Sequence, residues 1–194
     1  MRSFALLLAA LLTGCATAPA PEAPPLAAPH GAALRVTSPA FADHGTIPAA
    51  NTCDGAGASP PLTVEGVPAG ATVALLVGDP DAPLPQAPQQ NFTHWIAWNA
   101  PATDGNATFP EGHAASGAVE GQNGGGKTGW TPPCPPQGST PHRYVFTALA
   151  VNGTLDLAAG ATRAQLEAAL AGRVLASGSL TGCYMRVAQA PLPC

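Results

Sequence analysis

The sequence predicts a mainly β domain of short strands with one helix near its C-terminal end. Two runs, 72–78 and 142–151, are apolar on both faces, as is typical of central strands in a sheet. A third run, 93–99, alternates between two sets of side chains with the two-residue period of a strand. The segments between these runs are rich in the chain's 22 glycines and 23 prolines, which favour turns and loops. Because 46% of the residues are hydrophobic, we expect an ordered, loop-rich domain and not a disordered chain.

The N-terminus has the pattern of a bacterial lipoprotein leader. Arg2 is followed by an apolar run that is too short to cross a bilayer, as in a signal peptide. The run ends in Leu-Thr-Gly-Cys15, which resembles the lipobox, whose cysteine is lipidated and becomes the new N-terminus. Residues 1–14 are therefore predicted to be a lipoprotein signal peptide; the alternative is an ordinary signal peptide with a chance cysteine. Because Ala16 and not Asp follows Cys15, the lipobox resemblance implies an anchored outer-membrane protein of the bacterial cell envelope that faces the periplasm.

Composition separates a tether from a domain. Residues 15–33 are rich in alanine and proline and show no apolar period, which predicts a semi-rigid tether that begins at lipidated Cys15. Residues 34–194 have the length of one domain with a hydrophobic core. Charged residues make up 9% of the chain, and acidic residues outnumber basic ones by 11 to 7. No basic patch is left, so nucleic acid is not an expected partner.

The remaining cysteines suggest disulfides. Besides Cys15, the chain has Cys53, Cys134, Cys183 and Cys194. An even number of cysteines in an oxidising compartment predicts two disulfides, for which three pairings exist. A Cys183–Cys194 bond would close a short loop and contribute about 3 kcal/mol, and it would leave Cys53 to pair with Cys134. Zinc is the alternative ligand, but the spacings contain no Cys-x-x-Cys pair, and no metal or cofactor is expected.

The first half of the domain is expected to alternate short strands with turns. The expected elements are a strand at 34–37, a long loop at 41–61, an extended segment at 62–64, a turn at 66–70 and a central strand at 72–78. Pro80 cannot donate to a strand ladder, and it restricts Asp79 to an extended conformation. The central strand is therefore expected to end there and to expose Asp79 and Asp81 at its mouth.

The second half is expected to hold further strands and the helix. In strand 93–99, one face should carry Trp95, Ala97 and Asn99, and the other His94, Ile96 and Trp98. The later elements should be a loop at 101–141, the longest strand at 142–151, a helix at 161–172, an apolar segment at 174–176 and a last strand at 180–187. The helix begins with a capping-box pattern, Thr162 and Gln165, and Gly172 suits its C-terminal cap. Its apolar residues Leu166, Ala169 and Leu170 share one face.

Acidic and imidazole side chains are the first candidates for a site. Asp79 and Asp81 could act as a general acid–base pair, but a plainer interpretation is that one of them caps a turn. A histidine such as His94 in an apolar strand is more often a core residue than a catalyst. His142 begins a strand directly after a Gly/Pro loop, where binding residues often lie, and Arg143 could pair with an acid. The sequence has no Gly-x-Ser-x-Gly, His-Glu-x-x-His or phosphate-loop pattern.

Several motifs together resemble the phosphatidylethanolamine-binding protein family, most closely its bacterial branch, the Raf kinase inhibitor-like proteins. The matching segments are Thr52-Cys-Asp-Gly55, Ser59-Pro-Pro-Leu62, Asp79-Pro-Asp-Ala-Pro83, Thr93-His-Trp-Ile-Ala-Trp-Asn99, Pro133-Cys-Pro-Pro-Gln-Gly138, His142-Arg-Tyr144 and Leu180-Thr-Gly-Cys-Tyr-Met-Arg186. The resemblance covers residues 34–187 through several independent motifs, so a chance match is implausible.

The resemblance implies a β fold of two antiparallel sheets with a C-terminal helix, and a small pocket for anionic groups such as phosphate or a phospholipid headgroup. Matched position by position, the ligand-binding residues are Asp79, Asp81, His94, His142 and Tyr144, with Pro136 in the loop wall. The sequence departs from the branch at Trp130-Thr-Pro132-Pro133, where Tyr-x-Gly-Pro is usual. Because Pro132 has no amide donor, this departure changes one wall of the expected pocket.

We therefore expect a membrane-tethered binding module with an anion pocket and a regulatory role. Acids beside an anion require compensation, so we expect Asp79 to orient a histidine whose protonated form, with the Tyr144 hydroxyl, contacts the anion. Phosphate affinity should then rise as pH falls from about 8 to 6. The alternatives are an inhibitor of another protein, such as a protease, and a hydrolase that uses the Asp/His cluster. The hydrolase lacks an activated nucleophile in the sequence, and a protein partner is left open.

Overall fold

The structure is a computed structural model that describes residues 33–84 and 87–186. The predicted signal peptide, Cys15 and nearly all of the predicted tether lie outside these residues, as does Cys194. The described elements are β1 (Arg35–Thr37), β2 (Gly45–Thr46), the 3-10 helix η1 (Ala49–Asn51), β3 (Leu62–Glu65), β4 (Ala71–Leu84), β5 (Ala87–Pro101), β6 (Asn106–Phe109), β7 (Val119–Glu120), β8 (His142–Asn152), α1 (Arg163–Leu170) and β9 (Val174–Tyr184). No helix in this part of the chain is long and apolar enough to cross a membrane.

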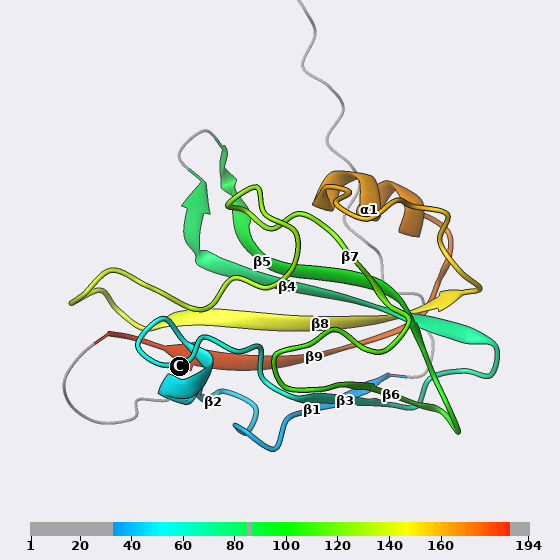
Figure 1. Cartoon of the computed structure of the whole chain (residues 1–194), viewed down its shortest axis with the longest axis horizontal. Coiled ribbons are helices and arrows are strands. Elements are labelled where there is room, and N and C mark those ends of the chain that lie inside the picture. The colour runs from blue at the N-terminus through cyan, green and yellow to red at the C-terminus, as the bar shows by residue number, and fades with distance from the viewer. Residues whose placement is uncertain (1–32, 85–86, 187–194) are drawn as a thin grey trace, which may run out of the picture.

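The strands form two sheets. The larger has the order β2-β9-β8-β4-β5-β7, and the smaller has the order β1-β3-β6. All neighbours pair antiparallel except β2 and β9, which pair in parallel over two residues. Figure 1 shows the smaller sheet on one side of the larger sheet and α1 on the other. The prediction of a mainly β fold with two sheets and a C-terminal helix is confirmed.

The central strands are apolar on both faces because each face of the larger sheet is covered. Alternate residues of β4, Val73, Leu75 and Val77, pack in the core between the two sheets. The residues between them, Ala74 and Leu76, belong to a second core under α1. The helix contributes Leu166 and Leu170, both fully buried. Burial of a leucine side chain contributes about 2 kcal/mol, so this face holds α1 against the sheet.

The predicted helix is confirmed, although α1 spans Arg163–Leu170 and is two residues shorter at each end than the predicted 161–172. The Thr162 side chain accepts a hydrogen bond from the Gln165 amide, and the Gln165 side chain accepts one from the Thr162 amide at 2.8 Å. This reciprocal capping box satisfies donors that the first helical turn leaves unpaired. Gly172 follows the helix with a φ of 72°, the left-handed conformation that a C-terminal glycine allows.

β4 does not end at Pro80, so this prediction is wrong. The ladder with β8 stops at Gly78, which pairs with Val145. Pairing with β5 nevertheless continues through Asp79 and is resumed at Pro83, with an irregular stretch between them. Pro80 lies in this stretch, where the missing amide interrupts no regular ladder. The expected exposure of the acids is wrong for Asp79, which is 1% exposed, whereas Asp81 is half-buried.

A bulge in β5 places His94 on an unexpected face. Val77 pairs with Trp95, whereas the next residue, Gly78, pairs with Thr93. One extra residue on the bulged strand breaks the two-residue alternation. His94 consequently lies against Tyr144 on the face that Trp95 shares. The expectation that His94 shares a face with Ile96 and Trp98 is therefore wrong.

Short strands and one 3-10 helix occupy parts of the predicted loops. β2 and η1 lie within 41–61, and β6 and β7 lie within 101–141. β6 pairs with β3 and completes the smaller sheet, with Ala107 and Phe109 buried. β9 is one strand that joins the predicted apolar segment at 174–176 to most of the predicted strand at 180–187. Gly178 lies within it, where a β-carbon would overlap the Leu34 carbonyl.

Candidate functional site

Asp79 is the buried centre of the candidate site. It follows the last β8-paired residue of β4, with 2% of its side chain exposed. Its Oδ1 accepts a hydrogen bond from the Asp81 amide at 2.8 Å, and its Oδ2 lies 2.8 Å from Nδ1 of His142 and 3.9 Å from Nε2 of His94. The contact with the Asp81 amide confirms the turn-capping interpretation. The contacts with the histidines show that the same carboxylate also orients an imidazole.

The hydrogen-bond partners of the histidines define their proton positions. Nδ1 of His142 faces a carboxylate and Nδ1 of His94 faces the Thr131 carbonyl at 2.8 Å. Both oxygens can only accept, so Nδ1 of each ring carries a proton. In the neutral ring Nε2 therefore carries no proton, and protonation at Nε2 would convert either residue to an imidazolium. Exposed fractions of 10% for His142 and 6% for His94 leave each side chain a narrow contact with the surface.

Tyr144 completes the group. It lies on β8 two residues after His142, on the same face of the strand, and its ring meets the His94 ring edge-on at 5.0 Å. Burial, followed by the negative charges of Asp79 and Asp81, raises the pKa of the Tyr144 phenol far above its ordinary value. The hydroxyl therefore stays protonated and can donate a hydrogen bond. We call Asp79, His94, His142 and Tyr144 the Asp79 cluster.

Asp81 lies beside the Asp79 cluster but is engaged by another residue. Arg143 donates to its two oxygens from Nη2 at 2.8 Å and Nε at 2.9 Å, and the Arg143 amide donates at 2.9 Å. The Arg143 side-chain hydrogen bonds are the main cause that lowers the pKa of Asp81 below its ordinary value. The interpretation that Arg143 pairs with an acid is confirmed. This pair forms a neutral rim next to the Asp79 cluster.

A loop wall covers His94 and is tied to the opposite loop. Thr131 donates its amide to the His94 carbonyl at 2.9 Å, and Trp130 donates its indole N–H to the Gly57 carbonyl at 3.0 Å. The predicted Cys53–Cys134 disulfide is present and links residues 81 positions apart. The Cys53 amide also donates to Pro133 at 3.0 Å. The predicted Cys183–Cys194 bond stays a prediction, because Cys194 lies outside the described residues.

Two prolines of the wall take different positions. Pro132 is half-buried and would lie 3.4 Å from a β-carbon at Gly57, so it packs against that loop. Its missing amide leaves the paired Thr131 backbone unaffected. Pro136 is exposed, and its carbonyl accepts the Ser139 amide at 3.2 Å in a turn. Its predicted place in the ligand wall stays a prediction.

Sequence reasoning missed an aromatic residue that packs against His94. The Phe92 ring meets the His94 ring edge-on at 4.9 Å. Gly124 lies against this ring, and a β-carbon there would approach Phe92 at 2.7 Å, so close packing favours glycine at this position. Phe92 stands two positions before His94 in the sequence, and the bulge at His94 places the imidazole beside Tyr144. No local pattern reports such a bulge.

The Asp79 cluster offers hydrogen bonds and not a set of metal ligands. Among the residues that the structure describes, no group of three or more His, Cys, Asp or Glu side chains is arranged to hold a metal ion. Asp79 has its two oxygens occupied by the Asp81 amide and by His142. The site is therefore built from hydrogen-bond donors around one carboxylate, an arrangement that can bind a polar ligand.

Comparison with known proteins identifies relatives along nearly the whole described chain. The family model for phosphatidylethanolamine-binding protein matches residues 37–185. A UPF0098 protein of Pyrococcus abyssi is 41% identical over 157 residues, which cover 77% of this chain and 84% of that protein. A UPF0098 protein of Methanothermobacter thermautotrophicus is 40% identical over 157 residues, which cover 79% of this chain and 99% of that protein.

Two solved structures share the fold. One is a homolog of phosphatidylethanolamine-binding protein from Chlamydia trachomatis, with a TM-score of 0.72 and 37% identity, covering 80% of this chain and 99% of that one. The other is YbcL of E. coli, described as a member of the mammalian family of that name. Its TM-score is 0.71 at 29% identity, covering 80% of this chain and 100% of that one.

Proposed function

The chain belongs to the phosphatidylethanolamine-binding protein family, and we propose that it binds a small anion, phosphate or a phospholipid-headgroup phosphate, at the Asp79 cluster. The observation that supports this proposal is the 2.8 Å contact between Asp79 and Nδ1 of His142. It orients an imidazole whose second nitrogen, Nε2, is left for a ligand. Tyr144 adds a hydroxyl that remains protonated.

Charge balance explains how an anion can approach two acids. Arg143 neutralises Asp81, so this pair adds no net charge near the ligand. Protonation of His142 at Nε2 would neutralise Asp79 and present an N–H to the anion, and protonation of His94 would give the cluster a net positive charge. Hydrogen bonds between charged partners are about twice as strong as neutral ones. Anion affinity should therefore increase as the histidines become protonated.

The pH dependence of phosphate binding tests this mechanism. Isothermal titration of the purified full chain with inorganic phosphate should give an affinity that rises as pH falls from about 8 to 6, where histidine side chains titrate. His142→Ala should remove most of the rise, and His94→Ala should reduce it. His44→Asn is the matched control, because His44 is exposed and Asn tolerates its φ of 58°. An affinity that stays flat over this range, or an unchanged His94→Ala profile, would contradict the proposal.

Native mass spectrometry provides a second measurement on the same variants. A small anion that copurifies with the wild-type chain and is lost with His94→Ala would support the anion site. Bound zinc would instead favour a hydrolase. If neither is retained, the inhibitor alternative gains weight. The three outcomes separate binding, catalysis and inhibition whatever the chemical identity of the ligand.

We also propose that the protein is held on the periplasmic face of the outer membrane through lipidated Cys15, within the Raf kinase inhibitor-like branch and with a regulatory role. The leader and the lipobox pattern support this placement. One acyl chain anchors a protein only marginally, whereas several anchor it stably. Cell fractionation of the full chain should recover it with membranes, and Cys15→Ala should release it. Recovery of both forms in the same fraction would contradict the anchor.

A further inference from the structure

The chain contains three Asn-x-Thr sequences, and the Asp79 cluster includes none of their residues. They are Asn91-Phe-Thr93, Asn106-Ala-Thr108 and Asn152-Gly-Thr154. In an exported protein, Asn-x-Ser/Thr with any residue except proline at x is the acceptor sequence for N-linked glycans. The transferring enzyme has to reach both the asparagine amide and the hydroxyl two residues later. The fold decides which of the three sequences meets this condition.

Asn106 and Thr108 both face solvent from strand β6. Side chains two residues apart in a strand lie on the same face of a sheet. Exposure along β6 alternates accordingly, so that Asn106 and Thr108 are exposed while Ala107 and Phe109 are buried in the core between the sheets. β6 is also the end strand of the smaller sheet, with β3 as its one neighbour in that sheet. An enzyme can therefore reach the amide and the hydroxyl from the same side.

A tight turn presents Asn106 at the start of β6. The Thr103 amide donates to the Asn106 carbonyl at 2.8 Å, and the Asn106 amide donates to the Thr103 carbonyl at 2.9 Å. Asp104 and Gly105 between them have φ values of 50° and 76°, as in a two-residue hairpin turn. Nδ2 of Asn106 donates to the Asp104 carbonyl at 3.0 Å in an exposed position. Such a bond is readily exchanged for one to water or to an enzyme.

An acidic residue precedes this asparagine by two positions. Asp104 is exposed, and its carboxylate forms no ion pair among the residues that the structure describes. Bacterial enzymes that attach N-linked glycans select an acidic residue at this position in addition to Asn-x-Ser/Thr. The other two sequences have Gln89 and Ala150 there. Of the three sequences, Asn106-Ala-Thr108 is therefore the one with the complete bacterial pattern.

The other two sequences are also less accessible to an enzyme. The sequence at 91–93 ends in Thr93, which is 7% exposed, so its hydroxyl is largely covered. The sequence at 152–154 is fixed through its backbone. Arg173 donates from Nη2 to its first and last carbonyls at 2.7 and 2.8 Å, and the Thr72 hydroxyl donates to its middle carbonyl at 2.7 Å. This segment would have to break these bonds to fit an active site.

We infer that Asn106 is an N-glycosylation site, which receives an oligosaccharide from a polyprenyl-pyrophosphate carrier in the periplasm. Nδ2 of Asn106 forms a bond to the anomeric carbon of the first sugar and gives up one proton. The bond from that carbon to the pyrophosphate oxygen breaks, and the polyprenyl pyrophosphate leaves with the electron pair. The glycan projects from the outer face of the smaller sheet. The inference rests on the proposed export of the chain and is independent of anion binding at the Asp79 cluster.

Intact-mass spectrometry of the full chain tests this inference. The chain is produced in a bacterial host that carries an N-linked oligosaccharyltransferase and its lipid-linked glycan. Wild type should gain the mass of one glycan, and peptide mapping should place it on Asn106. Asn106→Gln should lose the whole addition, and Asp104→Asn, which tolerates the φ of 50°, should lose most of it. Asn152→Gln is the matched control, because it removes an exposed asparagine of an equivalent sequence without the acid, and it should be glycosylated like the wild type.

The same spectra separate failure of the acceptor site from failure of export. A chain that retains residues 1–14 and carries no glycan contradicts the export on which the inference rests. A processed chain without a glycan, a glycan at Asn91 or Asn152 in place of Asn106, or full occupancy in Asp104→Asn would overturn the acceptor site itself. Because the mass is measured on the polypeptide, a variant that folds poorly still gives a result. Phosphate binding should be the same in Asn106→Gln and wild type.

Discussion

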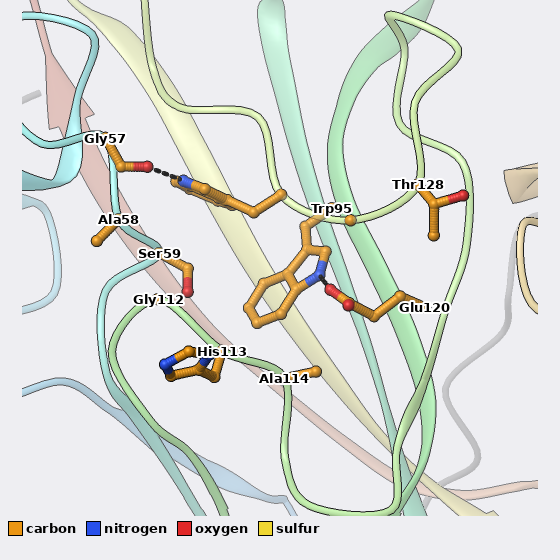
Figure 2. Close-up of a pocket in the computed structure, with 11 residues that line it drawn as sticks. Gly57, Ala58, Ser59, Trp95, Gly112, His113, Ala114, Glu120 and Thr128 are labelled. Carbon is orange, nitrogen blue, oxygen red and sulfur yellow. Dashed lines mark hydrogen bonds between the residues drawn. The ribbon is translucent and has the colours of Figure 1, made fainter.

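A pocket of about 340 Å³ lies beside the Asp79 cluster and is lined by residues that include Ser59, Trp95, Glu120 and Trp130 (Figure 2); we refer to it as the Trp95 pocket. The two regions satisfy their polar groups in opposite ways. Asp79 is almost fully buried, and its two oxygens are bonded by the Asp81 amide and by His142. Glu120 is half-buried and uses one oxygen for Trp95, while the Ser59 hydroxyl nearby has no partner. Trp130 contacts both regions. The Asp79 cluster therefore has partners for both oxygens of its carboxylate, whereas the Trp95 pocket keeps a buried hydroxyl without a partner.

This difference teaches what each region can contribute to stability and to binding. A buried carboxylate with all of its partners in place stabilises the fold, and removal of one member leaves the others unsatisfied. Such a group responds to a ligand mainly through a change of protonation. A pocket with unpaired groups contributes little to stability, because its polar atoms have been dehydrated without compensation. It has the greater capacity for a new hydrogen bond.

The largest effect is expected when the carboxylate of the Asp79 cluster is removed. Asp79→Ala leaves the His142 Nδ1–H and the Asp81 amide without acceptors, which should lower the free energy of unfolding by about 3 kcal/mol. Urea denaturation of the full chain measures this change. Asp156→Ala is the control, because Asp156 is exposed and forms no ion pair among the described residues. A loss below about 1 kcal/mol would show that the cluster is not the self-sufficient network described above.

Asp79→Asn sharpens the same comparison. The amide oxygen can still accept from the Asp81 amide, and the amide nitrogen can donate to Nδ1 of His142 if the ring moves its proton to Nε2. Stability should therefore fall less than in Asp79→Ala. The negative charge that balances an imidazolium is nevertheless gone. The pH profile of phosphate affinity in this variant should therefore differ from that of the wild type, although most of the stability is retained. Isothermal titration and urea denaturation of the same variant measure the two properties separately.

An intermediate effect is expected at the rim, where Asp81 pairs with Arg143. The pKa of Asp81 in the folded chain lies below its ordinary value of 3.8, chiefly because of the Arg143 hydrogen bonds. A lowered folded-state pKa stabilises the fold above the unfolded pKa, and this contribution is lost as pH falls through the folded value. Half of the Arg143 side chain is exposed. After allowance for solvent screening, Asp81→Asn should reduce stability by only about 0.5–1 kcal/mol at neutral pH.

The pH profile distinguishes this ion pair from a packing effect. The difference in stability between wild type and Asp81→Asn should be constant above pH 5 or so and should shrink as the pH falls below about 4. Thermal unfolding at a series of pH values measures it, with Asp156→Asn as a control that should follow the wild type throughout. A difference that persists undiminished at low pH would assign the effect to shape and not to charge.

The sequence predicts the framework of the two regions better than their detail. Runs 72–78 and 142–151 are apolar on both faces because they lie between two cores, and this property is local to each strand. The capping box at Thr162 is equally local. The continuation of β4 past Pro80 was not predictable, because it depends on pairing with β5 and not on β4 itself. Short strands such as β6 are defined by their partners and carry too few residues to show a period.

The two regions also differ in how far the sequence predicts them. Motif spacing and the family resemblance name the members of the Asp79 cluster, and the structure brings those side chains together. The approach of His94 to them, however, depends on a bulge that follows from register. The Trp95 pocket has no signature at all, since Ser59 lies in a loop and Glu120 in the two-residue strand β7. Only the fold joins them, together with the disulfide that ties the Cys53 loop to the Cys134 loop.

The smallest effect on the free energy of unfolding is expected in the Trp95 pocket. The sign of this effect tests whether the two regions differ. Ser59→Ala removes a buried hydroxyl that has no partner, so the free energy of unfolding should be unchanged or higher by up to about 1 kcal/mol. Thr52→Val is the matched control on the same loop, because the Thr52 hydroxyl is buried, donates to the Ala49 carbonyl at 3.0 Å and accepts the Asp54 amide at 3.3 Å. It should lose about 1–2 kcal/mol. Parallel urea denaturation of the two variants in ligand-free buffer decides the point. If Ser59→Ala is destabilised as much as Thr52→Val, the hydroxyl is already satisfied within the protein, and the contrast between a closed cluster and an open pocket does not hold.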